Sequence, residues 1–337
     1  AAIDYTLTPY SDFVAAEKAL LTEESYKADD QFWQGKLNNL MPSDNLLQSS
    51  ERQAQQPGQG ELTAFALPTD LCDAITRYCA ENQATPASFY LTAFVVLLFR
   101  YSGQTDITTG VPFSVRGEEK FDHTLGHFIN MLPIRHQLNG EHAFTETLMQ
   151  VNKAIFQGID HGNFPFSHMV KNVQGESRNS LYPLFSVTFN YQSTALAQSI
   201  QGVVAEYAQH FPCTLVDEIC QVGEYPLSLD VTPENRFVIK YDASKYHIGF
   251  IESMARHYQK LLESVVASPQ TALADIDYLT HDEKLQLLET WNHTARKWPE
   301  NKSLYDLFNE QAKHQPDAPA ICFKDEKLSY RELNLRV

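Results

Sequence analysis

The chain has 337 residues, enough for one large domain and part of another, and 43% of them are hydrophobic. This composition, which includes 20 Phe and 16 Tyr, is typical of a packed globular protein and excludes a disordered one. A formal net charge of −16 argues against a nucleic-acid surface and against an anionic membrane. We therefore expect neither nucleic acid nor a membrane among its partners.

The chain is predicted to open with helix, loop and strand. Residues 11–40 are predicted to be helical, because apolar side chains recur at helical offsets from Phe13 to Leu37. Residues 41–60 are rich in Ser, Gln, Pro and Gly, which indicates an exposed loop. Residues 61–68 alternate like a strand.

Two further helices follow. The first is predicted over residues 69–84, with Thr69 or Asp70 as its N-terminal cap. The second has Pro86 at its first helical position and ends at Gly103. It is apolar on nearly all sides, so we expect it at the centre of the fold, and its apolar run is too short to cross a bilayer.

The remaining pattern predicts one sheet with helices packed against it. A buried strand is expected over 106–116, ending near Pro112. The inward side chains of an amphipathic helix over 143–162 are expected to be Phe144, Leu148, Val151, Ile155 and Phe156. Three more strands and a last long helix are expected over 184–192, 225–234, 236–242 and 248–266. This interleaving predicts an α/β sandwich.

The cysteines and the N-terminus indicate a reducing compartment. The five cysteines are Cys72, Cys79, Cys213, Cys220 and Cys322. None forms a CxxC pair, so they are expected to be mostly buried thiols. The N-terminal residues also lack the pattern of a secretory signal, so we expect a cytoplasmic protein.

Three short pieces concentrate polar residues among apolar ones: GVPFSVRG from Gly110, LGHFINMLPIR from Leu125, and HGNFPFSHMV from His161. In each piece a glycine or proline constrains the backbone while an Arg, Asn or His could face a cavity. Turns and strand ends with ordinary side-chain hydrogen bonds are an equally good interpretation of any one piece. His123 and His127 have an offset that could suit a metal on a helix, but surface or core histidines are the more common case, so no metal site is predicted.

Four segments resemble, in order and spacing, consecutive motifs of the condensation domains of nonribosomal peptide synthetases. The segments are YSDFVAAE from Tyr10, LGHFINMLPIR, HGNFPFS from His161, and SRNSLYPLFSVTFNYQ from Ser177. The corresponding family forms are roughly Y-x-D-[FY]-A-V-W, G-x-F-V-N-T-x-x-x-R, [HN]-Q-D-x-P-F-E and R-D-x-S-R-x-P-L-F. The first match is imperfect, because this sequence has Ala16 and Glu17 where the family tends to have Val and Trp.

The C-terminal part carries a second resemblance. The segments LLETWNHTARKWPENKSLYDLFNEQAKHQPDAPAI and LSYRELN are similar to the linker that leaves a condensation domain and to the opening of an adenylation domain. The two resemblances imply a C-terminal condensation lobe over 1–272, a condensation–adenylation linker over 273–302, and the truncated start of an adenylation domain over 303–337.

The resemblance implies an α/β fold similar to one lobe of chloramphenicol acetyltransferase, with a mixed β-sheet flanked by helices. In the family, two such lobes form a V, and a H-H-x-x-x-D-G motif on the N-terminal lobe meets the substrates at their junction. No such motif occurs in this sequence. We therefore expect no catalytic residue in the chain, and a lobe that is inactive on its own.

The resemblance also implies substrates and partners. In the family, an amine on one carrier protein attacks a thioester on another, and both substrates arrive on phosphopantetheine arms. No cofactor is expected to bind the chain directly. The expected partners are the N-terminal condensation lobe, peptidyl carrier proteins and the adjoining adenylation domain.

Arg116, Asn130 and Asn190 are candidates for the polar wall of the substrate tunnel, because each lies where a strand is expected to end beside a Gly, a Pro or an aromatic residue. His127 is a further candidate for this wall. Residues expected to be structural are Gly126 as a turn, Arg135 as the anchor of a strand end by a salt bridge, and Pro165 and Phe166 as shapers of backbone and core. The expected core residues of the strand in the second motif are Phe128, Ile129, Leu132 and Ile134.

Three alternatives stay open. The first is a non-catalytic platform that only docks carrier proteins. The second is a lobe of an epimerisation domain, which an adenylation start does not normally follow directly. The third is a free-standing acyltransferase that uses coenzyme A, which would leave the C-terminal resemblance unexplained.

Overall fold

The computed structural model divides into two compact units, Ala1–Thr280 and His281–Val337. It describes residues 8–21, 24–40, 46–47, 60–173, 180–192, 202, 204, 208, 225–233, 235–297 and 301–337. Most of the predicted loop over 41–60 lies outside the described residues, as do Cys213, Cys220 and the first residues of the fourth motif, 177–179. Each unit is described by itself below.

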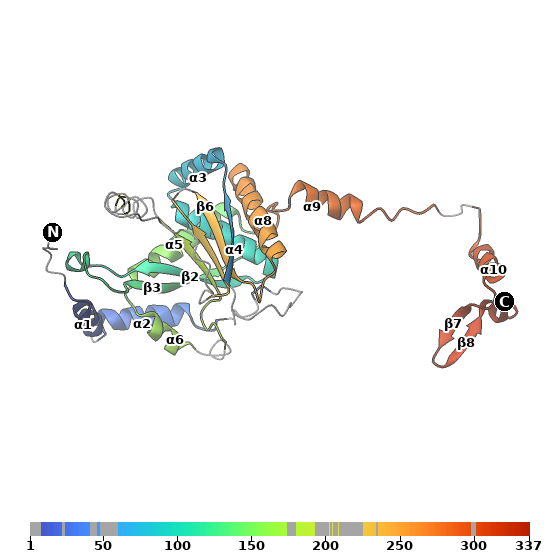
Figure 1. Cartoon of the computed structure of the whole chain (residues 1–337), viewed down its shortest axis with the longest axis horizontal. Helices are drawn as coiled ribbons and strands as arrows, with labels where there is room; N and C mark the ends of the chain where they lie inside the picture. The colour runs from blue at the N-terminus through green and yellow to red at the C-terminus, as the bar shows by residue number, and fades with distance from the viewer. Residues whose placement is uncertain are drawn as a thin grey trace. The chain divides into compact units, whose positions relative to one another are not determined.

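The centre of the first unit is a mixed sheet whose described strands have the order β1-β6-β5-β4-β2-β3 (Figure 1). The strands are β1 (Gly60–Ala66), β2 (Asp106–Ser114), β3 (Ile129–Gln137), β4 (Val187–Tyr191), β5 (Leu227–Val231) and β6 (Arg236–Asp242). The pairs β2·β4 and β4·β5 are parallel, and the other neighbouring pairs are antiparallel. The predicted mixed α/β sheet is thus confirmed.

Strand β2 continues past Pro112 to Ser114, so the prediction that it ends near Pro112 is wrong. Pairing with β4 stops at Gly110, whereas pairing with β3 continues through the Ser114–Ile129 pair. The hydrogen bond from Val115 N–H to the Phe128 carbonyl indicates that Pro112 occupies a position whose N–H would point away from β3. The missing N–H of this proline therefore costs no ladder hydrogen bond.

One large core packs four helices against the sheet. They are α3 (Thr69–Glu81), α4 (Pro86–Ser102), α5 (Phe144–Asp160) and α8 (Ile248–Ala267). Helix α4 is central as predicted, because its residues from Ser88 to Leu98 are all buried. Its ends are also as predicted: the Thr85 hydroxyl accepts from Ser88 N–H, and Gly103 ends the helix with φ of 70°.

Two predictions about α3 and α5 were wrong in detail. The N-cap of α3 is Pro68, and neither Thr69 nor Asp70 caps it, because both already lie inside the first turn. On α5 the buried positions include Phe144, Leu148 and Val151, but Phe156 is 50% exposed rather than inward. Position 156 lies next to the side of α5 that faces the core, and its side chain points towards solvent.

A second core lies where the second N-terminal helix meets β3. The predicted helix over 11–40 is two helices, α1 (Tyr10–Leu20) and α2 (Glu24–Lys36), and they pack against different partners. Helix α2 inserts Trp33 beside α6 (Phe166–Asn172) and the Leu132 and Ile134 side chains of β3. Leu132 and Ile134 occupy alternate positions of β3, which leaves Ile129 on the opposite face and 53% exposed, so its assignment to the core was wrong.

The first unit ends beyond the predicted boundary at residue 272. Leu273 and Ile276 are buried in the large core. The Arg100 guanidinium donates to the carbonyl oxygens of Leu273 and Ile276, at 3.0 Å each. Backbone bonds from Leu273 to His142 and from Ala274 to Gly140 hold the same segment. Residues 273–280 are therefore part of this unit.

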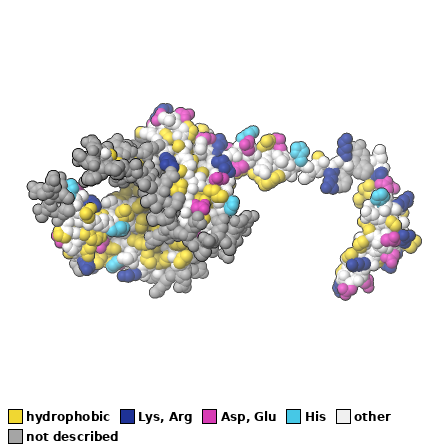
Figure 2. Space-filling view, viewed as in Figure 1, with side chains coloured by type: hydrophobic (Ala, Val, Ile, Leu, Met, Phe, Trp, Pro, Cys, Tyr) yellow, Lys and Arg dark blue, Asp and Glu magenta, His cyan; other side chains and the backbone are white. Residues whose placement is uncertain are grey.

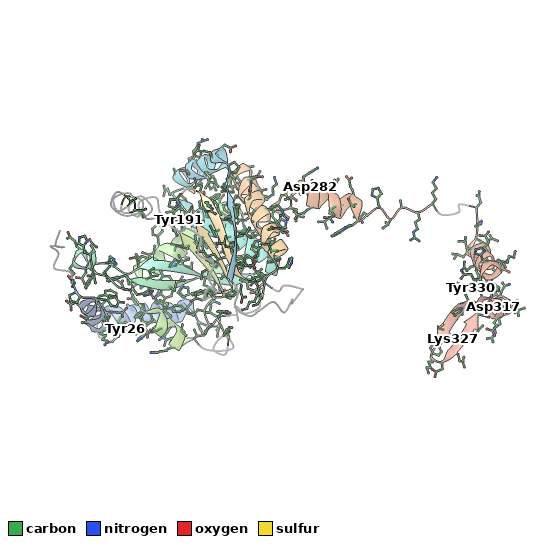
Figure 3. The ribbon with its side chains drawn as sticks, in the orientation of Figure 1. Tyr26, Tyr191, Asp282, Asp317, Lys327 and Tyr330 are labelled. Atoms are coloured by element: carbon green, nitrogen blue, oxygen red, sulfur yellow. The ribbon has the colours of Figure 1, made fainter. Side chains whose placement is uncertain are left out.

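The second unit is small. Its elements are α9 (His281–Leu285), the π-helical segment η3 (Gln286–Thr290), α10 (Leu304–His314), β7 (Pro319–Phe323), β8 (Glu326–Ser329) and α11 (Tyr330–Asn334). Reciprocal caps begin α10 and α11, where Ser303 pairs with Asp306 and Ser329 with Glu332. In Figure 3, Asp317, Lys327 and Tyr330 mark the hairpin and the following helix, and Figure 2 shows charged and hydrophobic side chains together on the surface of this unit.

Within the described ranges, no single helix is both long and apolar enough to cross a membrane. Helices α3 and α4 pass such a test only when taken together, and they are bent by 107° at the break between them.

Candidate functional site: a pocket beside the ends of β2 and β3

The loop between β2 and β3 is organised by Arg116. Its Nη1 donates to the carbonyl oxygens of Phe121, of Asp122 at 3.3 Å and of Thr124 at 3.0 Å. Its guanidinium carbon also lies 3.9 Å from the centre of the Phe128 ring. Arg116 was predicted to line the tunnel. In the structure its guanidinium contacts backbone carbonyls and the Phe128 ring, and these contacts stabilise the loop between β2 and β3.

Helix α1 docks on this loop through aromatic side chains. The Tyr10 hydroxyl donates to the His127 carbonyl at 2.7 Å. The Phe13 ring lies 5.5 Å from Phe121 and 4.6 Å from Phe128 between centroids. A Cβ on Gly126 would lie 2.1 Å from the Tyr10 ring, and Gly103 is the described glycine with a positive φ. Gly126 lies at a bend before β3, and its lack of a side chain permits the close approach of α1.

Asn130 fastens β3 to the turn at 161–166. Its Nδ2 donates to the carbonyl oxygens of Gly162 and Phe164, both at 2.8 Å. Its Oδ1 accepts from the N–H of Phe166 at 3.0 Å. Pro165 is the N-cap of α6, which Phe166 begins. The Asn130 amide was predicted to face the tunnel, and in the structure both its ends bond to this turn.

These contacts enclose a pocket of about 280 Å³. Helix α1, the loop and the turn supply its described lining: Phe13, Ala16, Glu17, Leu20, Val115, Gly117, Glu118, Phe121 and Asn163. Phe121 is buried and forms part of the apolar side, while Glu17, Glu118 and Asn163 are polar. Hydrophobic side chains are also visible on the surface of the region that holds α1, α2 and α6, at the lower left of Figure 2.

The other two tunnel candidates lie elsewhere or make different contacts. His127 is exposed and contributes its backbone carbonyl to α1. Asn190 lies near the end of β4, in register with Asp230 of β5, and is not among the described residues that line the pocket. Its neighbour Tyr191, labelled in Figure 3, stacks on Tyr90 at 6.2 Å between centroids. The structure thus brings Arg116, Gly126 and Asn130 together and keeps Asn190 on another strand.

A polar group beside Asn190 was missed by the sequence reasoning. Asp230 is buried, accepts from the Ser228 hydroxyl at 2.9 Å, and pairs with Lys240 at 2.6 Å. The signal was present, because Ser228 and Asp230 alternate with buried leucines on β5 and so share the opposite face of the sheet.

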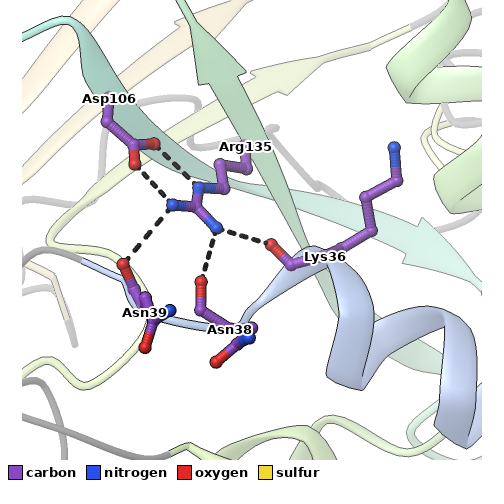
Figure 4. Close-up of polar contacts among 5 residues, drawn as sticks. All are labelled: Lys36, Asn38, Asn39, Asp106 and Arg135. Carbon is purple, nitrogen blue, oxygen red and sulfur yellow. Dashed lines mark hydrogen bonds and ion pairs between the residues drawn. The ribbon is translucent and has the colours of Figure 1, made fainter.

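Arg135 forms the salt bridge expected at a strand end (Figure 4). Its Nε and Nη2 donate to the two carboxylate oxygens of Asp106, at 2.8 and 2.5 Å. Its Nη1 donates to the carbonyl oxygens of Lys36 at 3.0 Å and Asn38 at 2.8 Å, at the C-terminal end of α2. The hydrogen bond to Asp106 raises the pKa of Arg135, so the guanidinium stays charged and joins α2 to β2 and β3.

Burial keeps one histidine of the core neutral, and another histidine of the first unit has a carboxylate partner. Complete burial lowers the pKa of His136 to about 3, so its imidazole is neutral, and its Nε2 lies 2.9 Å from the Thr109 hydroxyl. The Nδ1 of His161 lies 2.6 Å from Oδ1 of Asp29. In the part of the chain that the structure describes, no three His, Cys, Asp or Glu side chains gather closely enough to hold a metal ion.

Fold and motifs together define the class of protein. The described strands form a mixed sheet flanked by helices, and this fold is shared with a solved condensation-domain structure. Residues 4–288 match the condensation domain family. The chain belongs to the condensation domain family.

Similar proteins agree with this assignment. Polyketide synthase PksN of Bacillus subtilis (strain 168) is 30% identical over 328 residues, which are 96% of this chain and 6% of that protein. Tyrocidine synthase 3 of Brevibacillus parabrevis is 30% identical over 332 residues, which are 97% of this chain and 5% of that protein. The chain thus spans only a small fraction of these relatives.

Two solved structures share the fold. A four-domain nonribosomal peptide synthetase, holo-AB3403 bound to AMP and glycine, superposes with a TM-score of 0.73 at 20% identity, covering 93% of this chain and 24% of that one. The condensation domain of the Monacolin K polyketide synthase MokA superposes with a TM-score of 0.67 at 20% identity, covering 81% and 64%.

Proposed function

We propose that the first unit forms one wall of a site where an acyl or peptidyl group on one carrier protein is joined to the amino group of an aminoacyl unit on another. The amine nitrogen attacks the thioester carbonyl, the C–S bond breaks, and the thiol of the phosphopantetheine arm leaves with a proton. The observation that carries this proposal is the family match over residues 4–288, which includes the whole corner built by Arg116, Asn130 and the turn at 161–166.

The proposal requires a second lobe. The 337 residues contain no H-H-x-x-x-D-G sequence, so the histidine that takes a proton from the amine or positions it must come from another segment. We expect this chain alone to bind substrates without joining them.

The test uses two carrier proteins, one loaded with a radiolabelled acyl group and the other with an aminoacyl group. Transfer of label is measured with the chain alone and after addition of a lobe that carries H-H-x-x-x-D-G. Product should form above the uncatalysed rate only in the second case. Turnover by the chain alone would overturn the requirement for a second lobe.

We assign different parts to the four tunnel candidates within this proposal. Arg116 and Asn130 act as positioning residues, because the contacts of their polar groups are with backbone carbonyls and an N–H. His127 and Asn190 are the candidates for contact with substrate, since one is exposed and the other half-buried. In the reconstituted assay, His127→Ala and Asn190→Ala should change KM without changing stability. A loss of stability with an unchanged KM would contradict this assignment.

A docking platform for carrier proteins is the second candidate. It is favoured by the hydrogen bonds of Arg116 and Asn130, whose polar groups contact the backbone and do not face an open cavity. The two candidates differ in one outcome, because a platform would bind both loaded carriers and yield no product even after the histidine-bearing lobe is added.

The second unit opens an adenylation domain in this proposal. Capped helix α10, the β7–β8 hairpin and α11 support an ordered start, and relatives align over 96–97% of the chain, which includes this unit. A protein that continues through the residues after Val337 should catalyse ATP–pyrophosphate exchange that depends on an amino acid. Absence of exchange, or a natural end at Val337, would contradict it.

We further propose a cytoplasmic location. Cys72 and Cys79 are buried free thiols, which suits a reducing compartment. Cell fractionation with an antibody to the chain would test this location, and recovery in a secreted fraction would exclude it.

A further inference from the structure

The pocket beside α1 has a small side chain in its lining. Ala16 is half-buried and lines the pocket. The space of about 280 Å³ leaves room for an aromatic ring beside this alanine.

The apolar side of the pocket suits an aromatic group. Phe13 and Phe121 form an edge-to-face pair at 5.5 Å, and Leu20 and Val115 lie beside them. Arg116 and the backbone bonds of the loop hold Phe121 in place. The ring surfaces are therefore already positioned before any ligand arrives, which lowers the cost of binding.

The polar side of the pocket carries only one sign of charge. Its charged lining residues are Glu17 and Glu118, and no Lys or Arg is found among the lining residues that the structure describes. Glu118 pairs with Lys120 at 2.7 Å, so Glu17 is the carboxylate more available to a ligand. A cationic group at this end would be attracted and an anionic group repelled.

We propose that this pocket binds an arylalkylamine group, with its ring beside Ala16 against Phe13 and Phe121 and its ammonium group at Glu17. The proposal does not rest on the condensation chemistry, because binding can be measured on the chain by itself. An amine-bearing aromatic substrate group and a free amine share this chemistry.

The first test is a calorimetric titration with three probes that share one ring and differ in charge. Tryptamine should bind more tightly than indole, and indole more tightly than indole-3-propionate. If indole-3-propionate binds as tightly as tryptamine, or no probe binds, the proposal is overturned. Failure of the condensation assay would leave this titration unaffected.

The second test places a ring in the pocket. Ala16→Trp should abolish saturable binding of tryptamine, whereas Ala15→Trp, which adds the same ring at an exposed position of α1, should leave it unchanged. Circular dichroism checks that both variants fold. Equal binding by the two folded variants would overturn the proposed position of the ring.

The third test removes one negative charge. It tests the proposed contact of the ammonium group with Glu17 even if Ala16→Trp fails to fold. Glu17→Gln should weaken tryptamine binding by about three- to fivefold, the range expected for a partly exposed ion pair, and leave indole unchanged. Glu119→Gln is the control for the loss of a carboxylate, because Glu119 lies on the loop between β2 and β3 and outside the described lining. An equal effect of the two variants would contradict the role of Glu17.

Discussion

Asn130 is the side chain on which most of the corner depends. It makes three hydrogen bonds to the turn at 161–166, and its removal leaves two carbonyls and one N–H without this partner. We expect Asn130→Ala to lower the free energy of unfolding by about 2–3 kcal/mol. Urea denaturation measures this loss.

Asn190→Ala is the matched control for that measurement. Asn190 is also a half-buried strand asparagine, and no hydrogen bond of its side chain is described. Its replacement should change stability by less than about 0.5 kcal/mol. Equal losses for the two variants would show that the bonds of Asn130 contribute nothing specific.

His136 predicts how stability depends on pH. Burial lowers its pKa from 6.5 to about 3, so the unfolded chain binds a proton below pH 6.5 that the folded chain does not bind. Stability is therefore fully present above pH 6.5 and falls as the pH drops towards 3, by up to about 1.4 kcal/mol per pH unit. His136→Gln should flatten this part of the profile of urea midpoints. Asn190→Ala, which removes no titratable group, should leave this part of the profile unchanged.

The contact of α1 with its loop depends on the absence of a side chain at Gly126. A methyl group there would meet the Tyr10 ring at 2.1 Å, so Gly126→Ala should push α1 away and cost about 1–3 kcal/mol. Hydrogen exchange of the amides of α1 should then become faster. In a Tyr10→Ala background the same change should cost much less, and equal costs in both backgrounds would exclude a steric cause.

Elements with strong local signals could be predicted from the sequence, and their partners could not. Helix α4 was found through Pro86, Gly103 and an apolar run, all of which act within the element. The break between α1 and α2 was missed, because both parts have the same helical periodicity and differ only in what they pack against. Ile129 was misplaced because the inward face of β3 depends on its register with β2.

In the candidate site, too, the contact partners of the residues could not be predicted from the sequence. The motifs correctly marked Arg116, Gly126 and Asn130 as residues of one region. What each does depends on a segment distant in sequence: Asn130 bonds to Gly162, and Gly126 meets Tyr10. Spacing within a motif carries no information about such partners, so the contacts of these residues could not be predicted from the sequence.

At the scale of the molecule, the position of the C-terminal boundary of the first unit can be tested with fragments. A fragment that ends at Thr280 should unfold close to the temperature at which the first unit unfolds in the 337-residue chain. A fragment that ends at residue 272 loses Leu273 and Ile276 from the core and should be less stable by about 3–6 kcal/mol. Calorimetry compares the two, and equal stability would place the boundary at 272.

The pairing of β1 with β6 sets a delay during synthesis. Gly60 lies opposite Asp242, and β1 is at the end of the described sheet with β6 as its neighbour. At about 5–20 residues per second, the ribosome needs on the order of ten to forty seconds to make the chain between them. Throughout that time β1 has no partner strand to occupy its backbone groups. Until residue 242 has emerged, the newly made protein therefore has to be kept from pairing with other chains through β1. Slower translation should increase its aggregation.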